Sequence, residues 1–81
     1  MTWHVYILEC GDGSLYTGIT NDIERRIAQH RSGKGAKYTR TRGVKKLLYT
    51  VALVSRSEAL KREHEIKRLT RKEKLRIIKG S

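Results

Sequence analysis

The sequence predicts a small α/β domain in which helices cover one or both faces of a mostly antiparallel three-stranded sheet, in the order ββαβαα. Three observations support this fold class: two β-branched and aromatic runs joined by a glycine-rich turn, a third apolar run in mid-chain, and three helix-start signals. The chain has 81 residues, so we expect residues 1–81 to form a single domain with a small core.

The first two strands are expected to form a β-hairpin. Residues 3–9, WHVYILE, and residues 14–20, SLYTGIT, are rich in amino acids that favour strands. Gly11, Asp12 and Gly13 lie between them and are typical turn residues. The two segments should therefore pair as antiparallel neighbours.

The middle of the chain predicts a helix, a loop and a third strand. The helix covers residues 22–32, with Asn21 as its N-cap and Glu24 three residues on as a capping-box partner. Residues 31–46 hold seven basic residues and three glycines without helical or strand periodicity, which predicts a basic loop. Residues 47–54, LLYTVALV, are apolar enough to form an inner strand.

Two further helices complete the predicted domain. Ser55, followed by Glu58, forms a capping-box pattern that predicts a helix over residues 56–68. The same pattern at Thr70 begins a short final helix that ends at Gly80.

The charge of the chain points to a polyanionic partner. Lysine and arginine number 19 against 8 acidic residues, for a net charge of +11 and a pI near 10.3. The charge is uneven, because residues 1–24 carry −4 and residues 25–81 carry +15. Nucleic acid is the first partner that such a surface suggests, and general solubility is the alternative.

The rest of the composition excludes several classes of protein. Cys10 is the single cysteine, so no intrachain disulfide is expected, which fits a reducing cytoplasm. No apolar run approaches the ~20 residues of a membrane-spanning helix. We therefore expect a cytoplasmic protein with no membrane partner.

Helical periodicity makes Glu63 conspicuous. At ~100° per residue it lies about 40° from Ala59, within the apolar stripe that Ile66 continues, whereas Glu65 points away from that stripe. Burying a carboxylate costs several kcal/mol unless it is paired, protonated or bound to a metal. From helix geometry alone, an ion pair with an arginine and a functional site are both open.

Asp22, Arg26 and His30 share one row of the predicted first helix, at intervals of four residues. One arrangement is an intrahelical Asp22–Arg26 pair beside a solvated His30. In the other, the guanidinium and the imidazole project into one cleft, where they hold a phosphate and assist proton transfer. Geometry alone does not choose between them.

The predicted hairpin carries two tyrosines and one glycine of interest. Tyr6 and Tyr16 lie on its two strands, and Gly18 interrupts the second strand where a backbone or ligand can approach closely. Tyrosines in strands are usually core aromatics with a hydroxyl at the rim. Each residue taken alone is therefore explained by packing.

Taken together, these residues resemble the GIY-YIG nuclease domain. HVY at residues 4–6 stands in the place of the first motif, and YTG at residues 16–18 in the place of the second. The likeness covers nearly the whole chain. It is strongest to small stand-alone bacterial proteins of the YhbQ type, through the strings LYTGITNDIERR, GKGAKYTR and EIKRLTRKEKL.

The resemblance implies the GIY-YIG fold and a divalent-metal-dependent endonuclease with one Mg²⁺ or Mn²⁺ site. It implies that Glu63 binds the metal and that Arg26 holds the scissile phosphate. The role of general base falls jointly on the two motif tyrosines, and some members of the family carry a histidine on the same helix as the arginine. An imidazole there is chemically suited to relay the proton. Tyr6 and Tyr16 match the motif tyrosines. Gly18 matches the motif glycine, and His30 matches the histidine.

Two positions depart from the pattern of the family. The first motif glycine is His4, and the lysine that often follows the second motif is Ile19. The missing lysine removes a cation that would lower the pKa of a tyrosine. We therefore expect a competent but slow site.

The expected substrate is DNA, including structured or branched DNA, in repair or recombination, while RNA and a protein partner for targeting stay open. Two other functions are open: a non-catalytic nucleic-acid-binding module that keeps the GIY-YIG fold, and a small subunit that adapts to an acidic partner. The residues expected to contact phosphates lie in the basic loop: Lys34, Lys37, Arg40, Arg42, Lys45 and Lys46.

Overall fold

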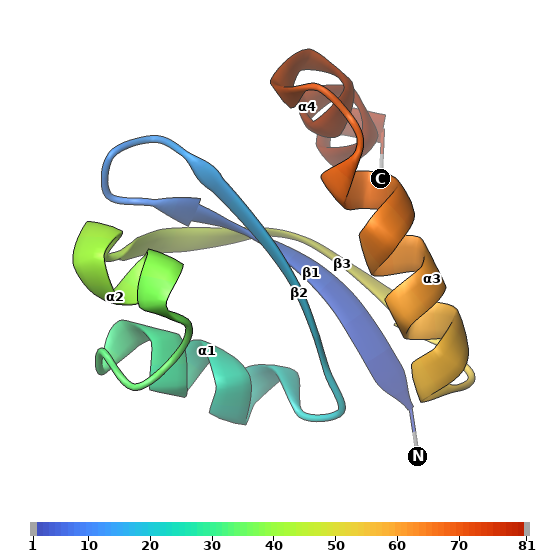
Figure 1. The fold of residues 1–81 in the computed structure, drawn as a ribbon, viewed down its shortest axis with the longest axis horizontal. Helices are drawn as coiled ribbons and strands as arrows, with labels where there is room; N and C mark the ends of the chain where they lie inside the picture. The colour runs from blue at the N-terminus through green and yellow to red at the C-terminus, as the bar shows by residue number, and fades with distance from the viewer. Residues whose placement is uncertain (1, 81) are drawn as a thin grey trace.

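The computed structural model describes residues 2–80, which form three strands and four helices (Figure 1). The strands are β1 (Trp3–Cys10), β2 (Leu15–Thr20) and β3 (Val44–Leu53). The helices are α1 (Ile23–Arg31), α2 (Lys37–Arg42), α3 (Arg56–Lys67) and α4 (Arg71–Gly80). Within this range, no helix combines the length and apolar character needed to cross a membrane.

The three strands form one antiparallel sheet in the order β2-β1-β3, so the first strand lies in the middle. Strand β1 pairs with β2 as a hairpin, and Tyr6 stands opposite Gly18 in that register. On its other side β1 pairs with β3, where Tyr6 stands opposite Thr50. The predicted hairpin and antiparallel sheet are confirmed.

The two faces of the sheet are covered by different helices, α1 and α2 on one side and α3 with α4 on the other (Figure 1). Side chains of β1 alternate between these faces. Val5 and Ile7 pack with residues of α3 in the hydrophobic core. Tyr6, which lies between them in the chain, points the other way and contacts His30 of α1.

The prediction of a loop over residues 31–46 is wrong in two places. Residues 37–42, KYTRTR, form the short helix α2, and β3 begins at Val44 rather than at residue 47. Helix α2 has no apolar stripe, and its buried residue, Thr39, contacts His30 on α1. Tertiary contacts therefore stabilise a segment that would be too short to form a helix alone.

The start of α1 also differs from the prediction. Asp22, rather than Asn21, is the N-cap, and its side chain accepts a hydrogen bond of 3.1 Å from the backbone N–H of Arg25. Glu24 lies one position earlier in the helix than a capping box requires. Its charge in the first turn is nevertheless favourable at the helix N-terminus.

The caps predicted for the last two helices are confirmed. The hydroxyl of Ser55 accepts a hydrogen bond of 3.2 Å from the backbone N–H of Glu58. Thr70 and Glu73 form a reciprocal capping box, in which each backbone N–H donates to the other side chain, at 2.9 and 3.2 Å. Helix α4 begins there and includes Gly80 as its last residue.

Candidate active site

Tyr6 and His30 form a buried hydrogen-bonded pair between the central strand and α1. Oη of Tyr6 lies 2.8 Å from Nε2 of His30, although the two residues are 24 apart in the chain. Each residue is 1% exposed. The two polar groups therefore satisfy one another inside the protein.

A second hydrogen bond holds the other side of the imidazole. Nδ1 of His30 lies 2.6 Å from Oγ1 of Thr39 on α2, and that hydroxyl donates to the backbone oxygen of Ala36 at 3.0 Å. Burial, and after it the charge of Arg26, lowers the pKa of His30 from 6.5 to about 4. The imidazole is therefore neutral at pH 7, and the alternative of a solvated His30 is wrong.

Two glycines make room for this pair. A Cβ atom on Gly18 would lie 2.5 Å from Oη and 2.7 Å from Cζ of Tyr6. A Cβ atom on Gly35 would collide with Nδ1 and Cγ of His30. Both ring systems therefore occupy space that is open because these positions lack a side chain.

Charged side chains on both faces of the sheet influence Tyr6. Burial raises the pKa of Tyr6, and the guanidinium of Arg26 on α1 opposes this through a side-chain hydrogen bond and through its charge. Tyr16 and the carboxylate of Glu63 on α3 raise the same pKa. Arg26 and Glu63 therefore both lie within electrostatic range of one phenol.

Arg26 is half-buried, and a neighbour on its own helix holds its guanidinium. Nη1 of Arg26 donates to Oε1 of Gln29 at 3.0 Å. The side chain of Asp22 instead caps α1, so the intrahelical Asp22–Arg26 pair considered above is not the arrangement found. The charge of Arg26 acts on Tyr6 and His30.

Tyr16 and Tyr38 extend the cluster beyond the buried pair. The ring centroid of Tyr16 lies 5.2 Å from that of His30 and 6.3 Å from that of Tyr6. Tyr38 on α2 lies 5.8 Å from Tyr16, and the guanidinium carbon of Arg42 lies 3.8 Å from the Tyr38 ring centroid. Tyr16 is half-buried, so it is the more accessible of the two motif tyrosines.

Glu63 has the partial burial that helix geometry predicted, with its side chain 19% exposed. Its ion pair is with Nζ of Lys67 at 3.5 Å, one turn along α3, and not with an arginine. Glu65, predicted to be a solvated acid, is exposed and pairs with Arg62 at 3.5 Å. The two acids on the same helix therefore differ in burial as expected.

The surroundings of Glu63 fit a largely hydrated divalent ion. Residues 2–80 contain no group of three or more His, Cys, Asp or Glu side chains that could hold a metal together. Mg²⁺ commonly binds through one or two carboxylates and keeps several waters. A single partly buried carboxylate near Tyr6 suits such an ion and does not suit a structural zinc site.

The residues predicted to contact phosphates are exposed, but one of them is already engaged. Arg42 forms an ion pair of 3.1 Å with Asp12 of the β1–β2 turn, and it also covers Tyr38. The others are distributed over the segment after α1, helix α2 and strand β3: Lys34, Lys37, Arg40, Lys45 and Lys46.

The two departures from the family pattern occupy different surroundings. Ile19 packs against the hydrophobic core on the side of α3. His4 has a buried Nδ1 that lacks a hydrogen-bond partner among the described residues. The apolar packing of Ile19 replaces the cation that a lysine would bring, so Arg26 is the cation that acts on Tyr6.

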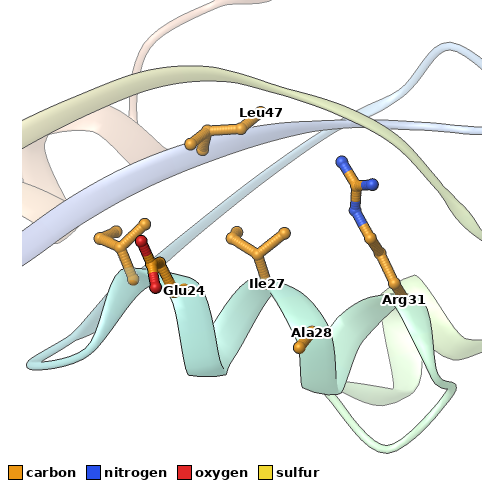
Figure 2. Close-up of a pocket in the computed structure, with 6 residues that line it drawn as sticks. Glu24, Ile27, Ala28, Arg31 and Leu47 are labelled. Atoms are coloured by element: carbon orange, nitrogen blue, oxygen red, sulfur yellow. The ribbon is translucent and has the colours of Figure 1, made fainter.

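An open groove lies apart from this cluster, between α1 and β3 (Figure 2). Figure 2 shows Ile27 projecting from α1 toward Leu47 of β3. The groove has a volume of about 380 Å³ and is lined by Ile23, Glu24, Ile27, Ala28, Arg31 and Leu47. These residues include none of the tyrosine–histidine cluster, so the groove is not the candidate site.

Three residues of the site were missed by sequence reasoning: Thr39, Gly35 and Gln29. Gln29 follows Arg26 by three residues on one helix, a spacing that places two side chains side by side and could have revealed the contact. Thr39 and Gly35 reach His30 across the turn between two helices. Periodicity within one element gives no signal for such contacts.

The chain matches a known domain family along most of its length. The sequence model of the GIY-YIG catalytic domain matches residues 2–76. The UPF0213 protein BH0048 of Halalkalibacterium halodurans is 54% identical over 78 residues, which cover 96% of this chain and 83% of that protein.

Two solution NMR structures are similar to the whole fold. That of the UPF0213 protein BH0048 from Bacillus halodurans has a TM-score of 0.65 at 52% identity, covering 100% of this chain and 86% of that one. That of the protein EF2693 from E. faecalis has a TM-score of 0.67 at 44% identity, covering 99% and 85%. The chain therefore belongs to the GIY-YIG nuclease superfamily, and its close homologues are small stand-alone UPF0213 proteins of bacteria.

Proposed function

We propose that the protein is a divalent-metal-dependent endonuclease that hydrolyses phosphodiester bonds in DNA, in a repair or recombination process. The observation that carries this proposal is the buried 2.8 Å hydrogen bond between Tyr6 and the neutral imidazole of His30, with the charges of Arg26 and, more weakly, of Glu63 acting on the same phenol. A carboxylate beside a bound phosphate would weaken simple binding by charge repulsion. Its presence favours chemistry over binding alone.

Arg26 is the group that holds the phosphate. Its guanidinium carries a fixed positive charge, and Gln29 restrains one of its nitrogens. Hydrolysis adds negative charge to the phosphate oxygens in the transition state, and a restrained cation stabilises that charge without reorganising. Arg26 therefore serves both binding and catalysis.

Tyr6 and His30 offer a route for the proton of the attacking water. The Tyr6 oxygen accepts that proton while its own hydroxyl proton passes to Nε2 of His30, 2.8 Å away. The charge of Arg26 helps to keep the pKa of His30 low, and a bound phosphodiester offsets that charge. Substrate binding thereby makes His30 a stronger base. Tyr16, beside the same imidazole, shares the assignment.

Glu63 is the residue that would hold the divalent ion, Mg²⁺ or Mn²⁺. Such an ion, when bound, supplies positive charge that polarises the phosphate and stabilises the leaving oxygen. Nζ of Lys67 lies 3.5 Å from this carboxylate, but the Lys67 side chain is 52% exposed, so the ion pair contributes little. The ammonium of Lys67 therefore balances the negative charge of the Glu63 carboxylate without blocking metal binding.

The exposed basic residues of α2 and β3 form the proposed nucleic-acid surface. Their positive charge attracts the phosphate backbone of a nucleic acid regardless of its base sequence. DNA with branched or unusual structure fits a small nuclease without a separate targeting domain in residues 2–80. RNA binding and a protein partner for targeting remain outcomes of the same test.

The test compares wild type with Glu63→Gln and with the matched variant Glu65→Gln. Both substitutions remove one carboxylate charge from α3, but Glu65 is exposed. Binding and cleavage are measured on supercoiled plasmid and on labelled duplex, flap, junction and single-stranded DNA and RNA, with Mg²⁺ or Mn²⁺. Wild type and Glu65→Gln should cleave, whereas Glu63→Gln should lose about 10²-fold to 10³-fold in rate and still bind.

Two results would contradict the proposal. If wild type and Glu63→Gln both bind nucleic acid and neither cleaves any substrate, the protein is a non-catalytic binding module. If neither binds and the protein instead forms a stable complex with an acidic protein, it is an adaptor subunit.

A further inference from the structure

The hydroxyl of Thr39 lies at one end of a buried chain of hydrogen bonds. Thr39 is 0% exposed, and its Oγ1 is 2.6 Å from Nδ1 of His30 and 3.0 Å from the backbone oxygen of Ala36. At the other end, Nε2 of His30 is 2.8 Å from the hydroxyl of Tyr6. The positive charge of Arg26 acts on the same phenol.

One end of this chain has a fixed role. The carbonyl oxygen of Ala36 only accepts hydrogen bonds. A hydroxyl has one hydrogen, so Thr39 gives its hydrogen to Ala36 and must accept one from Nδ1 of His30. All hydrogens in the chain therefore point from Tyr6 toward Ala36.

This direction fixes the tautomer of His30. With the hydrogen on Nδ1, Nε2 carries the lone pair and accepts the hydroxyl hydrogen of Tyr6. The Tyr6 oxygen then presents a lone pair, rather than a hydrogen, on the side away from His30. In the opposite tautomer Nε2 would donate to Tyr6, and the phenol would have to direct its hydrogen elsewhere.

We propose that Thr39 is a positioning residue that sets His30 in its Nδ1–H tautomer and thereby turns the hydroxyl hydrogen of Tyr6 toward the imidazole. Its catalytic consequence rests on the proposed function, because a phenol that presents a lone pair can take a proton from water. The tautomer itself is a property of the folded protein with or without a substrate. Thr39 also lies on α2 between Lys37 and Arg40, so the helix that carries those two cations holds the imidazole as well.

The test is the tautomer of His30 in ¹⁵N-labelled protein, measured by two-bond ¹H–¹⁵N NMR correlations of the imidazole rings at pH 7. Wild type is compared with Thr39→Val, which keeps the shape but removes the hydroxyl, and with Thr39→Ser, which keeps the hydroxyl. His64, exposed on α3, is the internal reference. Wild type and Thr39→Ser should show the Nδ1–H form, and Thr39→Val should shift His30 toward the Nε2–H form, since Nδ1–H would lose its acceptor.

Wild-type His30 in the Nε2–H form would overturn the proposal, and so would an unchanged Nδ1–H form in folded Thr39→Val. If Thr39→Val does not fold, the wild-type and Thr39→Ser spectra still decide the tautomer. Where wild type cleaves DNA, Thr39→Val should lower kcat with little change in KM, and Thr39→Ser should restore it. Absence of cleavage by wild type would remove the proposed function and leave the tautomer result standing.

Discussion

The phenol of Tyr6 lies directly against the backbone of Gly18, its partner across the β1–β2 ladder. The space that a side chain on Gly18 would fill is occupied by the tip of the Tyr6 ring. The glycine of the second motif is therefore required by the position of the tyrosine of the first. The same phenol lies 2.8 Å from Nε2 of His30.

Gly18→Ala is expected to displace Tyr6 and destabilise the fold. Its Cβ would lie 2.5 Å from Oη of a ring that is itself buried, so the ring must move. Overpacking of this kind costs about 1–3 kcal/mol. Urea denaturation measures the loss, and Gly80→Ala, where no atom approaches, should change stability by less than about 0.5 kcal/mol. Equal stability of the two variants would contradict the contact.

His30 is expected to make the fold sensitive to mild acid. Because burial lowers its pKa from 6.5 to about 4, the unfolded chain binds a proton below pH 6.5 that the folded protein does not. The stability that neutral His30 contributes is full above about pH 6.5 and is lost as the pH falls toward about 4, by about 3 kcal/mol in all.

Urea denaturation between pH 7 and pH 4 checks this, with His30→Gln as the control. Asp12 and Glu73, whose pKa values are lowered by hydrogen bonds from Ser14 and Thr70, add acid sensitivity at lower pH in both proteins and cancel in the comparison. Wild type should lose more stability than His30→Gln over this range. Parallel curves for the two proteins would show that His30 is not held neutral.

The cations of α2 are expected to contribute directly to the salt dependence of DNA binding. Lys37 and Arg40 are exposed, and each phosphate contact contributes about 0.9 to the slope of log K against log salt. Replacing both by Gln should reduce the magnitude of the slope by about 2. Lys72→Gln combined with Lys79→Gln removes the same charge from α4. Equal effects of the two pairs would indicate general attraction rather than a surface at α2.

Removal of Lys67 is expected to strengthen metal binding at Glu63. Its ammonium lies 3.5 Å from the carboxylate and competes with a cation there. Because ion pairs with one exposed partner contribute about 0.2–1 kcal/mol, Lys67→Met should raise the affinity for Mn²⁺ by about 1.4-fold to 5-fold. A Mn²⁺ titration followed by electron paramagnetic resonance measures this. Lys61→Met, on the same helix, should leave the affinity unchanged, and an equal rise there would refute the competition.

The parts of the fold that follow from local patterns were predictable. The hairpin, the strand pairing and the caps at Ser55 and Thr70 depend on residues within a few positions of one another. Glu63 stood out because helix periodicity alone places it among apolar neighbours. Asn21 was the wrong cap because Asp22, equally suited chemically, stands next to it.

The missed parts depend on contacts between elements. Helix α2 carries no apolar stripe, so its sequence is typical of a solvated loop. The hydrogen bond between Thr39 and His30, which stabilises the helix, joins two elements and leaves no local pattern. The hydrogen bond between Tyr6 and His30 spans 24 residues, and no spacing rule within a strand or a helix predicts it. The resemblance to a family supplied the residues of the site, but not the order of hydrogen bonds that connects them.

The order of the elements also determines when the site is completed during protein synthesis. Tyr6, Arg26 and His30 precede β3, whereas Glu63 comes from α3 together with the core residues Ala59 and Ile66. A nascent chain that has reached only β3 carries Tyr6, Arg26 and His30 without Glu63 and without the packing that covers one face of the sheet. On the ribosome, the residues proposed to hold a phosphate and to move a proton are therefore made before the carboxylate proposed to hold the metal.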